Sequence, residues 1–118
     1  MANEISVNLS ATITQSGQSV SGSGSFQANL SSTAFLGEAI TIGSSSAAAI
    51  YVAGLTNPSV VLIINQDTTN FITVDNIVGL TQFPQTLLPG QGVLLLPGTG
   101  TIYAKADTAP CQAWVVAG

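Results

Sequence analysis

The stretch EISVNLSATIT, residues 4–14, alternates apolar and polar side chains without interruption. Ile5, Val7, Leu9, Ala11 and Ile13 fall on one side of an extended chain, and the serine, threonine and asparagine residues between them fall on the other. This period of two predicts a half-buried β-strand of the antiparallel kind. Similar short runs recur along the chain, so this stretch indicates the class of the whole fold.

A turn and a second strand are expected directly after it. Gln15–Gln18 interrupts the alternation and contains Gly17, a residue that accepts the backbone torsions of tight turns. Apolar residues then share one parity over Ser19–Leu30. The centre of this run, Ser21–Ser25, has the composition of a flexible linker, but a strand is favoured because the same phase continues into Phe26 and beyond. Residues 1–30 are therefore expected to form a strand pair or arm, and the linker alternative would make that arm detachable.

Further short apolar runs, bounded by proline, glycine and asparagine turns, follow at the spacing of a β-sandwich: Ala39–Ile42, Ala49–Ala53, Ser59–Asn65, Phe71–Val74, Gly92–Leu96, Thr101–Ala106 and Cys111–Val116. Gly43–Ala49 fits either a loop or one helical turn. With some nine strands and no convincing helix, residues 1–118 are predicted to be a single all-β domain, an antiparallel β-sandwich or jelly roll.

The core is expected to form without a cofactor or a disulfide. A chain of 118 residues can bury roughly two-thirds of its unfolded surface, and its single cysteine cannot form an intrachain bridge. The largest apolar side chains are the expected core centres, namely Phe26, Phe35, Tyr51, Ile63, Phe71, Leu95, Tyr103 and Trp114.

Charge is scarce, and this excludes several classes of function. Charged residues make up 5% of the chain, where a soluble domain has about 25%, while serine, threonine, asparagine and glutamine account for 41 of the 118 residues. One lysine and a net charge of −4 argue against nucleic acid and anionic membranes as partners. Without histidine, neither a Ser-His-Asp triad nor an imidazole metal site can be built. Lysine also protects exposed sheet edges, so partners are expected to cover the edges here.

Candidate chemical groups each have a plainer structural interpretation. Lys105 could activate a serine, but its register favours an exposed strand residue paired with Asp107. Asp67 and Asp75 could act as paired carboxylates, and Asp67–Asn70 could bind calcium, but an Asx-type turn is favoured for that loop. Cys111 is expected to be a small buried hydrophobe. No catalytic, cofactor-binding or metal-binding residue is assigned.

Residues 60–116 resemble small β-sandwich virion proteins of tailed bacteriophages. The resemblance lies in VVLIINQDTTNFITV (residues 60–74), LPG (residues 88–90) and IYAKADTA (residues 102–109), and its most specific parts are the Asn-x-Asp-x-x-Asn-Phe loop and the Ile-Tyr-Ala-Lys-Ala-Asp-Thr segment. It implies a non-enzymatic protein that packs into the particle as capsid cement or as a tail component. A near-neutral surface suits this role, because like-charged copies packed side by side would repel one another.

The expected function is therefore that of a cement or decoration protein that forms homo-oligomers and bridges major capsid subunits. The N-terminal strand pair is the expected interface, with Ile5, Val7, Leu9 and Phe26 as its contact residues. Met1–Glu4 has no features of a secretory signal and no apolar run is long enough to span a bilayer, so the chain is expected to be made in the host cytoplasm and to end in the virion. A tail, adaptor or fibre-base component is the first alternative. A carbohydrate-binding module using Trp114, Tyr51 or Tyr103 is the alternative of another class.

Overall fold

A computed structural model of the chain describes residues 4–29, 36–50, 58–95 and 101–118. Over these residues the regular elements are all β-strands, and no helix is present that could cross a membrane. The strands are β1 (Glu4–Gln15), β2 (Gln18–Asn29), β3 (Leu36–Ile42), β4 (Ala48–Ala49), β5 (Val61–Asn65), β6 (Ile72–Asp75), β7 (Gln85–Leu87), β8 (Gly92–Leu95), β9 (Tyr103–Ala106) and β10 (Cys111–Ala117).

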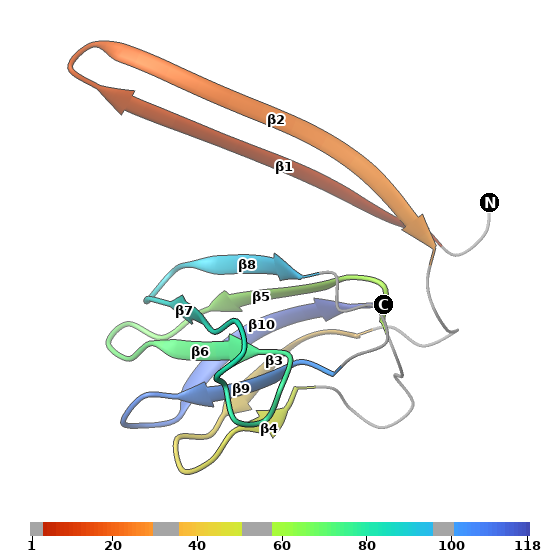
Figure 1. Ribbon diagram of the computed structural model, residues 1–118, viewed down its shortest axis with the longest axis vertical. Coiled ribbons are helices and arrows are strands. Elements are labelled where there is room, and N and C mark those ends of the chain that lie inside the picture. The colour runs from red at the N-terminus through yellow and green to blue at the C-terminus, as the bar shows by residue number, and fades with distance from the viewer. Residues whose placement is uncertain (1–3, 30–35, 51–57, 96–100) are drawn as a thin grey trace.

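The strands form one long hairpin and two four-stranded sheets (Figure 1). The first sheet, here called the β10 sheet, has the order β3-β10-β5-β8, and the second, the β6 sheet, has the order β4-β9-β6-β7. Every pairing is antiparallel. The prediction of an all-β antiparallel sandwich is confirmed.

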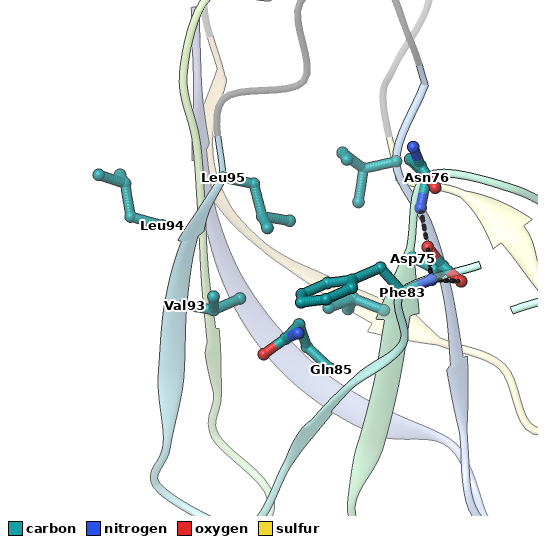
Figure 2. A pocket seen from close by; sticks show the side chains of 9 residues that line it. Asp75, Asn76, Phe83, Gln85, Val93, Leu94 and Leu95 are labelled. Atoms are coloured by element: carbon teal, nitrogen blue, oxygen red, sulfur yellow. Dashed lines mark hydrogen bonds between the residues drawn. The ribbon is translucent and has the colours of Figure 1, made fainter. Parts of the chain in front are cut away.

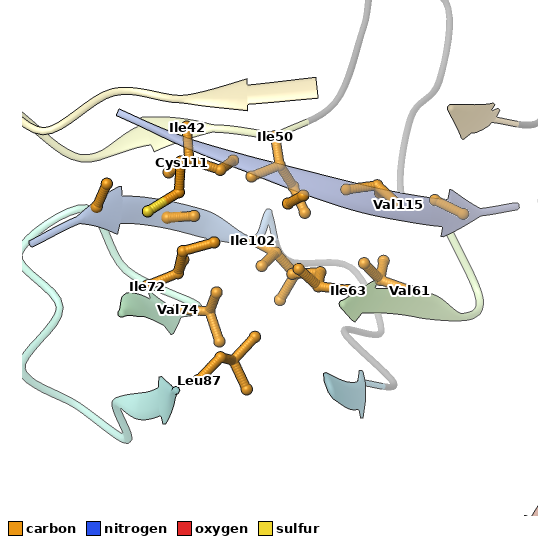
Figure 3. Packing of buried hydrophobic residues seen from close by; sticks show 14 residues of the cluster. Ile42, Ile50, Val61, Ile63, Ile72, Val74, Leu87, Ile102, Cys111 and Val115 are labelled. Carbon is orange, nitrogen blue, oxygen red and sulfur yellow. The ribbon is translucent and has the colours of Figure 1, made fainter. Parts of the chain in front are cut away.

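The core lies between the two sheets, where every second residue of β5, β6, β9 and β10 is buried (Figure 3). Strand β10 shows this alternation without a break: Cys111, Ala113, Val115 and Ala117 are buried, and the residues between them are exposed. Val61 and Ile63 of β5 meet Ile72 and Val74 of β6 within the same cluster, and all four are fully buried. The core therefore consists of β-branched side chains from central strands and small side chains from β9 and β10.

The expectation that the largest apolar side chains are the core centres is only partly correct. Ile63 is fully buried, but Phe26, Phe71, Leu95 and Tyr103 are half-buried. The prediction of Trp114 as a core residue is wrong, because the parity of β10 places its side chain on the outer face of the sheet, where it is 38% exposed. Phe35 and Tyr51 lie outside the described residues.

Most predicted strands begin and end within three residues of the observed ones, and residues 51–53 of the predicted strand Ala49–Ala53 lie outside the described residues. β2 runs unbroken through Ser21–Ser25, which confirms a strand over a linker there. The segment after Gly43 is a loop with bends, followed by the two-residue strand β4, and not a helical turn. Strand β7 was missed, because three residues after Pro84 give too short a pattern to detect.

The sheet edges are short. The edge strands β4, β7 and β8 contain 2, 3 and 4 residues, and the longer edge strand β3 carries an exposed charged residue, Glu38, opposite Val115. Short strands and charged residues on an edge strand are two ways in which sheets avoid pairing edge to edge. The described sandwich therefore depends less on partners to protect its edges than its lack of lysine suggested.

The hairpin of β1 and β2 stands apart from the sandwich as an arm (Figure 1). It forms a sheet of its own, with no ladder to either four-stranded sheet. The radius of gyration is 15.2 Å, compared with about 13.5 Å for a compact domain of this length. We call the hairpin, residues 4–29, the arm.

Candidate functional site

The arm has two chemically different faces, because cross-strand partners in an antiparallel ladder point to the same side. On one face, Ser6, Asn8, Ser10, Thr12 and Thr14 lie opposite glutamine and serine residues of β2, and Thr14 Oγ1 and Ser19 Oγ are 3.0 Å apart. We call the opposite side the apolar arm face; its cross-strand pairs are Ile5 with Ala28, Val7 with Phe26, Leu9 with Gly24, Ala11 with Gly22, and Ile13 with Val20. Glu4, which has the parity of the polar side and lies at the base of β1, is the one charged residue of the arm, and the apolar arm face has none.

The register of the arm is fixed by its turn. Ser16 and Gly17 connect the strands, with φ angles of 52° and 79°. Two consecutive residues with positive φ are typical of the type I′ turn, whose twist matches that of the flanking strands. A slip by one residue would move every apolar side chain to the polar side, so the turn and the alternation together define the apolar arm face.

Burial on the apolar arm face decreases from the base of the arm to its tip. Val7 is buried, and its neighbours Ile5, Phe26 and Ala28 are half-buried. Leu9 is 49% exposed, and Ile13 and Val20 near the turn are 70% and 73% exposed. Of the four contact residues expected from the sequence, only Leu9 thus offers much free apolar surface. Ile13 and Val20 were not among the expected contact residues, although Ile13 has the same parity as Leu9 and Val20 the same parity as Gly24, the cross-strand partner of Leu9.

An isolated arm of this kind is unfavourable in water. A two-stranded hairpin alone is marginally stable at best, and a third layer or strand is normally needed. Leu9, Ile13 and Val20 leave a line of apolar surface in solvent on such a hairpin. The geometry of the arm therefore suits a surface that is covered on association.

A second apolar surface lies on the outside of the β10 sheet. Trp114 is flanked by Ala39 of β3 and Ile64 of β5, and Val116 by Gly37 and Leu62 of the same two strands. Leu62 is in turn opposite Leu94 of β8. Trp114 and Val116 are 38% and 39% exposed, and none of these side chains is charged. We call this surface the β10 face; it ends at Gln112, whose Nε2 donates to Thr41 Oγ1 at 2.7 Å.

A pocket of about 390 Å³ opens between β8 and the β6 sheet, lined by Val74, Asp75, Asn76, Phe83, Gln85, Val93, Leu94, Leu95 and Ile102 (Figure 2). Asp75 is the only carboxylate among these residues. Its two oxygens accept hydrogen bonds from the backbone N–H groups of Asn76, Gln82 and Phe83 at 2.7–3.2 Å. This carboxylate therefore fastens the loop between β6 and β7, and its hydrogen-bonding capacity is used within the protein.

The loop of residues 65–70 is also held by a carboxylate that accepts hydrogen bonds from backbone N–H groups. Asp67 Oδ2 accepts the backbone N–H groups of Thr69 at 2.9 Å and Asn70 at 2.6 Å, which confirms the predicted Asx-type turn. The donors from Asn70 and then Thr69 lower the pKa of Asp67 below its ordinary value of 3.8. Asp67 lies in the loop before β6, and Asp75 is the last residue of that strand. The two carboxylates are thus at opposite ends of β6, and the structure does not bring them together as a catalytic pair. Within the described part of the chain, no three His, Cys, Asp or Glu side chains are grouped for a metal ion.

The remaining candidates also lie within the sandwich framework. Lys105 is half-buried in β9, opposite Thr73 of β6. Cys111 is buried, as expected, and desolvation, followed by the charges of Asp67 and Asp107, raises the pKa of its thiol above the ordinary 9.0. A neutral buried thiol is a poor nucleophile. Among the sugar-binding candidates, Tyr103 is half-buried, whereas Trp114 is exposed on the β10 face.

The chain was also compared with known proteins. No protein-family model, no curated protein and no solved structure matches it.

Proposed function

We propose that this protein is a non-enzymatic structural component of a bacteriophage virion, a capsid cement or decoration protein that forms homo-oligomers and bridges major capsid subunits. The observation that carries the proposal is the arm: a long hairpin whose one charged residue, Glu4, lies at its base, and whose distal apolar side chains, Leu9, Ile13 and Val20, are left in solvent by the chain's own fold. The resemblance of residues 60–116 to small β-sandwich virion proteins supports the part of the proposal that places the protein in a bacteriophage particle.

The surface chemistry supports the same role. Each copy offers many hydroxyl and amide groups and few charges, so neighbouring copies can form hydrogen bonds without strong mutual repulsion. Weak contacts repeated over a symmetric shell add up to a large total avidity. A cement protein requires such surfaces and no reacting group.

The experiment that tests this proposal is the stoichiometry of the chain against the major capsid protein. Particles are purified from an infected culture that expresses the chain, and both proteins are quantified by mass spectrometry. A ratio near one, or a simple fraction of one, supports the cement role. A ratio of a few per cent contradicts it in favour of a tail, adaptor or fibre-base component, and absence from the particle contradicts the virion assignment.

The exposure of Trp114 favours a second candidate, a carbohydrate-binding module. An indole on a flat, uncharged sheet face can stack on a sugar ring, and Gln112 and Thr41 add polar groups at the end of the same face. A glycan array tests this function. Saturable binding that is lost in Trp114→Ala, with the fold retained, supports it, and no binding by the wild-type protein contradicts it.

A further inference from the structure

The arm contains two glycines whose presence its own structure does not explain. Gly22 and Gly24 lie in the middle of β2, on the apolar arm face, opposite Ala11 and Leu9. Neither has a positive φ, and a Cβ atom added to either would meet no atom within 4 Å. Glycine weakens a strand, and in a strand it commonly marks the close approach of another backbone or ligand.

These glycines form a hollow on the apolar arm face. Towards the base the hollow is bounded by Phe26, and towards the tip by the pair Ile13 and Val20. Along β2 there is no side chain between Val20 and Phe26 on this face, because the intervening positions of the same parity are Gly22 and Gly24. The hollow is open to solvent, so a bulky side chain from outside can enter it.

The β10 face offers such a side chain. Trp114 is flanked there by small or half-buried neighbours, Ala39 and Ile64, so that its ring is a large exposed group on a sheet face. The exposed half of the arm, five residues on each strand, extends about 17 Å, and the seven residues of β10 extend about 24 Å. Two twisted sheets pack face to face through apolar side chains that interdigitate.

We propose that the arm of one copy docks on the β10 face of a second copy, with Trp114 of that copy seated over Gly22 and Gly24. The occupant is a second copy because the chain presents both surfaces, both lack charge, and its own fold leaves both uncovered. The proposal rests on the self-association in the proposed function and does not depend on location in a capsid.

The contact has a defined size. The exposed half of one arm covers about 17 by 10 Å, so even two reciprocal contacts remain below the ~1,200 Å² of typical stable interfaces. The association is therefore weak and concentration-dependent in solution, and is strengthened where many copies are held side by side.

The central experiment fills the hollow without disturbing the arm. Sedimentation velocity over a concentration series is measured for wild-type protein, Gly24→Val, and the matched control Ser25→Val, which places the same side chain on the polar face one residue away. Wild-type protein and Ser25→Val associate above the 11.9 kDa monomer, and Gly24→Val does not. Valine is favoured in strands and has open space at position 24, so loss of association there is not a loss of folding.

A mixing experiment identifies the two surfaces. Ile13→Lys removes the arm contact and Trp114→Glu removes the β10 face contact, so each variant alone is monomeric. Mixed together they associate, because the intact arm of the second docks on the intact face of the first and the two new charges attract. Phe83→Ser, which removes an exposed aromatic ring from the loop after β6, leaves association unchanged.

The outcomes separate the alternatives. A wild-type chain that remains monomeric at its highest soluble concentration overturns the proposal, and is the result expected if the arm docks on its own chain. Association of Trp114→Glu alone also overturns it, in favour of arm-to-arm pairing, because the arm of that variant is intact. A mixture that fails to associate overturns it as well. If association fails while the chain is stoichiometric in particles, the cement role stands and its contacts are with other virion proteins. If association follows the proposal and the chain is absent from particles, the docking stands without the virion role.

Discussion

The side chain of Asn65 connects the two sheets of the sandwich through the backbone of Leu87. Asn65 ends β5 in the β10 sheet, and its Nδ2 donates to the carbonyl oxygen of Leu87 in β7, at the edge of the β6 sheet, at 2.9 Å. The same Nδ2 donates to the Asn70 carbonyl at 3.0 Å, and Oδ1 accepts the Asp67 N–H at 2.9 Å. A fully buried amide thus has all these partners within the protein.

Asn65→Ala is expected to destabilise the fold by about 2–4 kcal/mol, because it removes three hydrogen bonds and leaves carbonyl groups without their donor. Urea denaturation measures the change in the free energy of unfolding. Gln66→Ala, at the exposed next position, is the control and is expected to change stability by less than about 0.5 kcal/mol. Equal stability of the two variants would contradict the bridging role.

Core and arm isoleucines are expected to differ sharply in their contribution to stability. Ile63 is fully buried, so Ile63→Ala costs about 2–5 kcal/mol in the free energy of unfolding. Ile13 is 70% exposed, so Ile13→Ala changes the monomer by less than about 0.5 kcal/mol. Both are measured by urea denaturation at low protein concentration, where the monomer dominates. A large effect of Ile13→Ala there would show that the arm packs on its own sandwich.

The pH dependence of stability is expected to include a contribution from Asp67. Its pKa in the folded protein lies below the ordinary 3.8, so the charged carboxylate favours the folded state. That contribution is present above the unfolded pKa and is lost as the pH falls through the lower, folded value. Asp67→Asn keeps a side-chain acceptor for the turn and removes this titration.

Urea midpoints measured from pH 5 down to pH 2 test this prediction. The loss of stability on acidification should be smaller in Asp67→Asn than in wild-type protein. Asp107→Asn, which removes another exposed carboxylate, serves as the control for a general change of charge. An unchanged acid slope in Asp67→Asn would mean that the Asx-type turn does not stabilise the charged form.

Cys111 is expected to resist thiol reagents in the folded state. It is buried and the pKa of its thiol is raised, so little thiolate is available and the reagent cannot reach it. An aromatic disulfide reagent at pH 8 should label the protein fully in urea and only slowly without it. Fast stoichiometric labelling of native protein would place Cys111 at the surface.

The strand framework was largely predictable from period two, and the orientation of β10 was the main exception. Nearly every residue of Cys111–Ala117 is apolar, so alternation of polarity could not decide which parity faces inward. Side-chain size suggested Trp114 for the core, but the space between the sheets is filled by Ile63, Val74 and Val115, and small residues of β10 complete it. Gln112 has the same parity as Trp114 and is the one signal that indicated an outward tryptophan.

The two faces of the arm were predictable from the sequence, but their exposure was not. The alternation of residues 4–14 identified the side chains that share the apolar face, but not the gradient of burial along it, because that gradient depends on tertiary structure at the base of the arm. The role of Asn65 also could not be predicted, since its partner strand β7 is only three residues long.

The central claim is that the distal half of the arm is covered by another copy of the chain. Hydrogen–deuterium exchange at a series of protein concentrations tests it most directly, because amides of a lone hairpin open easily. We expect protection of residues 9–24 and of β10 to rise with protein concentration, while protection of β6 does not change. Protection of residues 9–24 that is the same at every concentration would contradict it.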